Sequence, residues 1–119
     1  MTYPFEKQIK QISVQSFTYE IFMAGDIQEG KRFLTAYAGN DGACWSVEPT
    51  EYIYSGGREL GFIVRFINYP RFPRSKNEIK NEALNLATHL LFTLGQGSCS
   101  VVGPDETYWL TRRKEDTNG

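Results

Sequence analysis

Residues 75–95, SKNEIKNEALNLATHLLFTLG, decide the fold of the chain. The first four, from Ser75 to Glu78, have the spacing of a capping box, in which a serine hydroxyl and a glutamate carboxylate satisfy the first amides of a helix. Apolar residues then recur at helical spacing, and Gly95 or Gly97 stops the pattern. We therefore expect a helix with one apolar stripe, formed by Ile79, Ala83, Leu86, Leu90 and Leu94.

The segment before this helix predicts the central strand of a sheet. From residue 60 to residue 68, apolar side chains occupy both faces of the strand, and Arg65 is the one charge in the run. The glycine-rich turn of residues 55–58 joins it to another strand over residues 43–54. Because proline cannot donate a hydrogen bond to a sheet, Pro49 indicates that this other strand lies at an edge.

The remaining elements follow from shorter patterns. Residues 17–24 alternate between apolar and polar positions, as a half-buried strand does. Asp26 and Glu29 have capping-box spacing and predict a helix of about three turns that closes at Gly39. Two last strands are expected at residues 98–102 and 107–113, around a turn.

The predicted order is strand, helix, strand, strand, helix, strand, strand. This order favours an α+β fold, with an antiparallel sheet of about five strands and both helices on one face. The arrangement is ferredoxin-like, βαββαβ, with an extra C-terminal strand. We expect a single domain over residues 1–119, in which residues 1–13 form a loosely attached arm and residues 114–119 a frayed tail.

Composition excludes several classes of protein. With 40% hydrophobic residues, 14% aromatic residues and a formal net charge of −1, the chain is expected to fold rather than stay disordered. The uncharged stretch at residues 83–104 contains polar side chains and three glycines, so we expect no membrane span. The charged N-terminus lacks the features of a secretory signal, and an intracellular location is the default.

Histidine and cysteine are too scarce for most site chemistry. With a single histidine, His89, the chain has no paired-imidazole mechanism and no histidine-rich metal site, and we expect His89 to pack in the core or at an interface and not to act as a general base. Cys44 and Cys99 show no CxxC spacing and are interpreted as buried free thiols. No nucleophile has a recognisable base, so no catalytic residue, no metal ligand and no cofactor is predicted.

Residues 58–80 carry six positive side chains against two negative ones, which the balanced charge of the whole chain hides. Arginine offers a planar fork of donors that fits phosphate or carboxylate, and nearby rings at Tyr69 and Phe72 offer stacking surfaces for a base. The segment also runs into the start of a helix, where backbone amides favour an anion. The alternative is a solvated basic loop whose charges balance glutamates elsewhere.

Two surfaces of the predicted fold have no predicted helix or strand packed against them. One is the second face of the sheet, and the other is the outer face of the second helix, where Asn81, Asn85, Thr88 and Phe92 replace the usual charged residues. A homo-oligomer explains both, although loops or the N-terminal arm of the same chain are an alternative.

Three stretches resemble a group of small bacteriophage-encoded proteins. They are residues 48–57, EPTEYIYSGG, residues 67–73, INYPRFP, and residues 103–113, GPDETYWLTRR. Within that group, residues 17–113 resemble the first family of Thoeris anti-defence proteins. The resemblance implies an oligomeric sponge in the host cytoplasm that sequesters a cyclic ADP-ribose signal without cleaving it. It carries no residue assignment.

The leading hypothesis is therefore a non-enzymatic, oligomeric protein that binds a small anionic nucleotide, with no membrane and no nucleic acid polymer as partner. The runner-up is a protein-interaction module, such as a phage inhibitor or structural adaptor, that uses its aromatic and arginine surface. An enzyme acting on a phosphorylated small molecule comes third. The predicted ligand-binding residues are Arg58, Asn68, Tyr69, Arg71, Phe72, Arg74, Asn81, Trp109, Arg112 and Arg113.

Overall fold

The computed structural model describes residues 5–39 and 43–116. Along the chain, the elements are η1 (Phe5–Gln8), β1 (Thr18–Ala24), α1 (Ile27–Ala38), β2 (Ser46–Tyr54), β3 (Gly57–Ile67), α2 (Lys76–Thr93), β4 (Ser98–Val102), β5 (Thr107–Thr111) and η2 (Lys114–Asp116).

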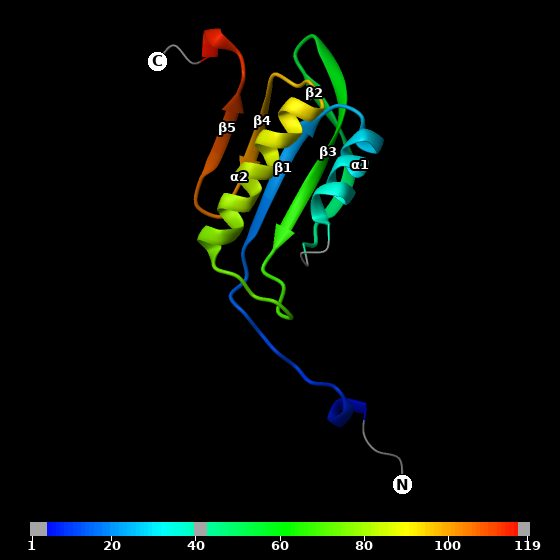
Figure 1. The fold of residues 1–119 in the computed structure, drawn as a ribbon, viewed down its shortest axis with the longest axis vertical. Helices are drawn as coiled ribbons and strands as arrows, with labels where there is room; N and C mark the ends of the chain where they lie inside the picture. Colours follow the sequence, from blue (N-terminus) through cyan, green and yellow to red (C-terminus); the bar gives the residue numbers. More distant parts are fainter. Residues whose placement is uncertain (1–4, 40–42, 117–119) are drawn as a thin grey trace.

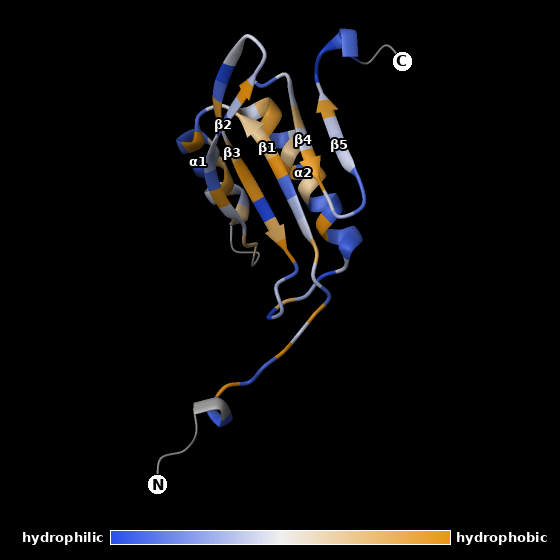
Figure 2. Cartoon of the chain, turned by 180° about the vertical axis from the view of Figure 1, so that it is seen from behind, coloured by the Kyte–Doolittle hydropathy of each residue, from blue (hydrophilic) through white to orange (hydrophobic). Residues whose placement is uncertain are grey.

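The five strands form one antiparallel sheet in the order β2-β3-β1-β4-β5. Both helices lie on the same face of this sheet (Figure 1). Seen from behind, the opposite face carries no helix (Figure 2). The first four strands of this order, β2-β3-β1-β4, form the ferredoxin-like arrangement, and β5 is added beside β4. The predicted fold class is confirmed.

The core lies between the helices and every second residue of the strands. In β1 the buried positions alternate with half-buried ones, and Ile21 and Met23 are fully enclosed. In α2 the apolar stripe faces them, with Leu86 and Leu90 also fully enclosed. Burial of a leucine side chain stabilises a fold by about 1.5–3 kcal/mol. The stripe that the sequence predicted is therefore what attaches α2 to the sheet.

Both helices begin at the residues that the sequence indicated. The Ser75 hydroxyl accepts from the Glu78 amide at 3.1 Å, and the Glu78 carboxylate accepts from the Ser75 amide at 3.2 Å, which confirms the capping box of α2. At α1 the Asp26 carboxylate accepts from the Gln28 amide at 2.8 Å. Two of the amides at the start of α2, those of Ser75 and Glu78, are thus used by the cap.

Several boundaries differ from the prediction. β3 begins at Gly57, because the turn before it is tighter than expected and pairs Tyr54 with Gly57. β5 ends at Thr111, because η2 follows and Asp116 accepts from the Thr111 hydroxyl at 2.7 Å. Within the predicted tail, residues 114–116 form η2, and residues 117–119 lie outside the described ones.

The predicted N-terminal arm is described from residue 5 onward. It runs away from the sheet below β1 (Figure 1), and its Ile9 side chain is 71% exposed. Residues 1–4 lie outside the described part. Among residues 5–39 and 43–116, no helix has the length and apolarity needed to cross a membrane.

On the open face of the sheet, a glycine allows one tyrosine to lie across two strands. The hydroxyl of Tyr52 reaches over Gly61 and donates to the backbone oxygen of Met23 at 3.1 Å. Burial raises the pKa of Tyr52 to about 12. A methyl group at Gly61 would overlap the backbone oxygen of Met23 and the Tyr52 ring. This position therefore needs glycine for space.

We expect Gly61→Ala to lower the free energy of unfolding by about 1–3 kcal/mol, because the sheet must shift to admit the added methyl group. Urea denaturation followed by circular dichroism measures the change. The matched control is Gly57→Ala in the same strand, where the added atom meets the end of the Tyr54 ring at 3.2 Å. Equal stability of Gly61→Ala and wild type would contradict this account of the open face.

Candidate functional site

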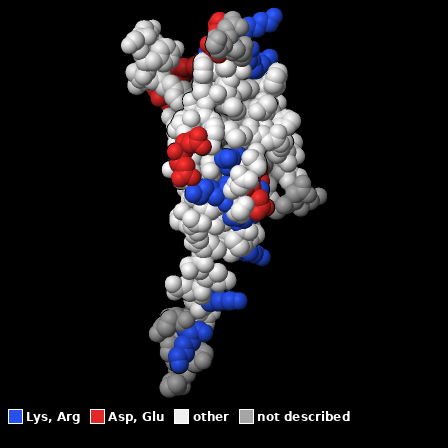
Figure 3. All heavy atoms as spheres, turned by 90° about the vertical axis from the view of Figure 1, so that its left-hand side faces the viewer, with Lys and Arg blue, Asp and Glu red and all other residues white. Residues whose placement is uncertain are grey.

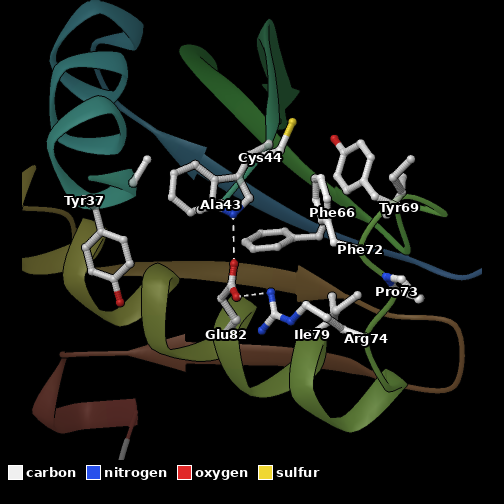
Figure 4. A pocket seen from close by; sticks show the side chains of 13 residues that line it. Tyr37, Ala43, Cys44, Phe66, Tyr69, Phe72, Pro73, Arg74, Ile79 and Glu82 are labelled. Atoms are coloured by element: carbon white, nitrogen blue, oxygen red, sulfur yellow. Dashed lines mark hydrogen bonds and ion pairs between the residues drawn. The ribbon is translucent and has the colours of Figure 1, made fainter. Parts of the chain in front are cut away.

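A cavity of about 540 Å³ opens where β3 ends and α2 begins (Figure 4). Its lining comes from five parts of the chain: the end of α1, residues 43–45 before β2, the end of β3, the loop of residues 69–74, and the first turns of α2. This size is within the range of small-molecule sites, which span about 300–1,000 Å³. The cavity is the best-formed candidate site among the described residues.

Aromatic rings form the upper part of this cavity (Figure 4). The ring of Trp45 lies 6.1 Å from that of Phe66 and 6.2 Å from that of Tyr37, measured between centroids. On the loop side, Tyr69 and Phe72 lie 5.5 Å apart. Rings in this arrangement offer flat apolar surfaces on which a heteroaromatic base can stack, at about 1–3 kcal/mol per base.

Below the rings, one carboxylate is held by donors from two sides. The indole nitrogen of Trp45 donates to Oε1 of Glu82 at 3.1 Å. The guanidinium of Arg74 forms an ion pair with Oε2 of the same carboxylate. The Glu82 side chain is 21% exposed and that of Arg74 is 37% exposed. The cavity therefore presents an acidic and a basic group next to each other, both within reach of solvent.

The mouth of the cavity brings Tyr69 and Cys44 together from two different segments (Figure 4). A hydrogen bond with the Cys44 thiol, reinforced by burial, raises the pKa of Tyr69 to about 12. The Tyr69 phenol consequently stays protonated at physiological pH and can act as a donor, not as a base.

Three of the predicted ligand-binding residues line this cavity: Tyr69, Phe72 and Arg74. Asn68 lies beside them but is buried, and its carboxamide bonds to two backbone groups of the chain. Arg71 is exposed on the same loop and is not among the lining residues. The structure therefore places this loop beside the cavity, and only some of its predicted residues line it.

The other predicted residues lie elsewhere. Arg58 is at the far end of the β2–β3 hairpin, where it pairs with Glu51 at 3.3 Å. Asn81 lines a shallow hollow on the outer side of α2, which shares Arg74 and Glu82 with the cavity. A separate groove between α2 and β5 contains Trp109 and Arg112, with the Arg112 guanidinium 4.3 Å from the centre of the Phe92 ring.

Arg113 lies between β5 and η2 and forms an ion pair with Asp116 at 3.9 Å. It contributes to neither the cavity nor the groove. The predicted set therefore divides among several surfaces of the molecule, and the structure does not gather it into one arginine-rich cavity.

The positive segment at residues 58–80 is largely neutralised by acids from elsewhere in the chain. Arg65 pairs with Glu20 at 2.7 Å and with Glu48 at 2.6 Å, and Lys76 pairs with Asp105 at 3.1 Å. Figure 3 shows positive and negative side chains adjacent on one face of the body. Arg65 and Lys76 therefore fit the alternative interpretation, in which the basic segment balances acidic side chains elsewhere in the chain.

Sequence reasoning missed two residues that define the cavity, Trp45 and Glu82. Glu82 had the spacing of ordinary helix surface patterning, and Trp45 lay in the predicted edge strand. The contact between them joins positions 37 apart. A pairing of that kind carries no local signal, so only the fold could reveal it. Among the described residues, no group of three or more His, Cys, Asp or Glu side chains could hold a metal ion.

No family model matches the chain, and no curated protein sequence matches it. Two solved structures share its fold. Both are phage SAM lyases. One, in the apo state, is 18% identical with a TM-score of 0.65, and the match covers 82% of this chain and 90% of that one. The other, in complex with S-methyl-5'-thioadenosine, is 17% identical with a TM-score of 0.66, covering 87% of this chain and 95% of that one.

This finding corrects the predicted function. The two matched structures are of lyases, which are enzymes, and this contradicts the expectation of a non-enzymatic protein that sequesters a cyclic ADP-ribose signal. It also gives no support to the protein-interaction module. The resemblance to the Thoeris anti-defence family is neither confirmed nor refuted by these structures.

The two thiols are expected to differ in reactivity. The prediction that both thiols are buried is wrong for Cys44, which is exposed, and holds for Cys99. Burial raises the pKa of Cys99 from its ordinary value of 9.0 to about 11. Because the thiolate is the reactive form, Ellman's reagent at pH 8 should label one thiol in the folded chain and both in urea. The Cys44→Ser variant is the control and should show no fast labelling. Rapid labelling of Cys99 in the folded chain would contradict the structure.

Proposed function

We propose that this protein is a SAM lyase, which binds S-adenosylmethionine in the cavity and cleaves it in the cytoplasm of a host cell. The observation that carries the proposal is the pairing of aromatic rings with the adjacent Arg74 and Glu82 groups in one cavity, on a fold shared with phage SAM lyases. The structure solved with S-methyl-5'-thioadenosine supports a nucleoside ligand for this fold.

The parts of the substrate match the parts of the cavity. An adenine ring can stack on the Tyr69 and Phe72 rings or on Trp45. The amino-acid end carries an ammonium and a carboxylate group, which have the opposite charges to Glu82 and Arg74. The central sulfonium is a cation, and cations are attracted to the faces of aromatic rings by about 0.5–2 kcal/mol.

The chemistry of a sulfonium explains how a site with few acid-base groups can be an enzyme. When the bond between sulfur and the methionine side chain breaks, its electron pair moves to sulfur, and S-methyl-5'-thioadenosine leaves as a neutral thioether. A lyase adds no water, so the carbon that loses sulfur takes its new bond from within the substrate. The substrate's own carboxylate oxygen can form that bond and close a lactone, and this route requires no protein base.

In this scheme the protein contributes orientation. The proposed role of Arg74 and Glu82 is to hold the amino-acid end, so that its carboxylate lies close to the carbon that it attacks. Orientation of two reacting groups can contribute about 7–11 kcal/mol to the lowering of a barrier. The substrate thus supplies the nucleophile and the leaving group, and the cavity supplies their geometry.

The predicted homo-oligomer stays a prediction. The feature that favours it is the open face of the sheet, which no helix within residues 5–39 and 43–116 covers (Figure 2).

Incubation with S-adenosylmethionine, followed by chromatography and mass spectrometry, tests the proposal. We expect S-methyl-5'-thioadenosine together with a four-carbon lactone. Because a hydrogen bond to a charged group contributes about 1.5–3 kcal/mol, Glu82→Gln and Arg74→Met should each lower kcat/KM by about tenfold or more. The matched control is Arg58→Met, which removes an arginine of the distant Arg58–Glu51 pair and should leave cleavage unchanged.

Two results would contradict the proposal. One is the absence of both cleavage and a rise in melting temperature when S-adenosylmethionine is added to the wild-type protein. The other is cleavage that proceeds equally well in the wild-type protein and in the Glu82→Gln and Arg74→Met variants, because the reaction would then occur outside this cavity.

A further inference from the structure

Asn68 links the segment just before β1 to a residue that lines the cavity. Its side-chain nitrogen donates to the backbone oxygen of Gln15 at 2.9 Å. Its side-chain oxygen accepts from the backbone amide of Arg74, also at 2.9 Å. The residue is 9% exposed and is the one buried polar or charged residue among those described. Both ends of the carboxamide are therefore committed to the chain itself.

The contacts continue from Arg74 into the cavity. Arg74 stands immediately before the cap of α2, and its guanidinium holds Oε2 of Glu82. The other oxygen of Glu82 accepts from the indole of Trp45. A continuous series of polar contacts thus runs from Gln15 through Asn68, Arg74 and Glu82 to Trp45. Only the last members of this series line the cavity.

The bond from Asn68 fixes the backbone at the point where the loop becomes a helix. Pro73 precedes Arg74 and restricts the residue before it to extended conformations. The amide of Ser75 is held by Glu78 in the capping box. With the Arg74 amide held as well, this short segment has few other conformations available, and the Arg74 side chain leaves it in a fixed direction toward Glu82.

We propose that Asn68 is a positioning residue of this site, which holds the backbone of Arg74 so that Arg74 and Trp45 grip the Glu82 carboxylate from two sides. This inference rests on the proposed function, because it assigns to the cavity the ligand named there. Asn68 touches no ligand in this scheme, in contrast to the expectation from the sequence. Its effect reaches the substrate through Arg74 and Glu82.

The test uses Trp45 as an optical reporter of the cavity. The chain has two tryptophans, and Trp109→Phe leaves Trp45 as the single emitter. Trp109 is 55% exposed and lies in the groove beside β5, away from the cavity. In this background, Asn68→Leu removes both hydrogen bonds at similar size. Asn68→Asp keeps the acceptor for the Arg74 amide and loses the donor to Gln15.

We expect Asn68→Leu to expose Trp45, with emission shifted to longer wavelength and stronger quenching by acrylamide, as in Glu82→Gln. We expect its KM for S-adenosylmethionine to rise by about tenfold, as the loss of one buried hydrogen bond to a positioned group implies. Asn68→Asp should restore the emission of the parent and keep KM within about threefold of it. A purely structural role would lower stability without this selective rescue.

Two outcomes overturn the inference: parent-like Trp45 emission and KM in a folded Asn68→Leu variant, or equal loss in Asn68→Asp and Asn68→Leu. Should Asn68→Leu fail to fold, Asn68→Ser, whose shorter side chain reaches neither partner, takes its place. The emission readout needs no substrate. Failure of the wild-type protein to cleave S-adenosylmethionine would therefore count against the proposed function and leave the assignment of Asn68 to be decided by Trp45.

Discussion

The packing of α2 against the sheet is the constraint on which the rest of the structure depends. Its buried stripe includes Ala83, Leu86 and Leu90, which are enclosed against the strands. Once that stripe faces the core, the rotation of the helix is set. Glu82 is next to the buried Ala83 in the sequence, so its side chain lies at the border of the buried face of the helix. The direction of the acidic group in the cavity is thus a consequence of apolar burial.

Short sequence patterns predicted most of the helices and strands, because each of these elements is determined by residues close together in the sequence. The capping box at Ser75, the apolar stripe of α2 and the alternation in β1 each depend on residues within a few positions of one another. The order of these elements is enough to select the ferredoxin-like arrangement. The ends of β3 and β5 were harder to place, because a tight turn and the Asp116 contact decide them.

The site was only partly predictable, because its parts meet through the fold. The loop that carries Tyr69, Phe72 and Arg74 had a visible signal in its arginines and rings. The partners of that loop did not, since Trp45 and Glu82 come from distant segments. Excess charge in a stretch of sequence also says little when acids elsewhere neutralise it, as Glu20 and Glu48 do for Arg65. The expectation of a non-enzyme assumed that catalysis needs ionisable pairs, and a reactive sulfonium substrate removes that need.

The edge strand β2 limits how this sheet can grow. Exposed strand edges tend to recruit further strands, and a nine-residue edge such as β2 would be a ready template. Pro49 lies near its middle, paired with Phe62 on the inner side, and has no amide to offer on either side. A strand from another molecule would meet an interruption there. Pro49 is therefore an obstacle, at this one edge of the sheet, to continuous hydrogen bonding with a strand of a second molecule.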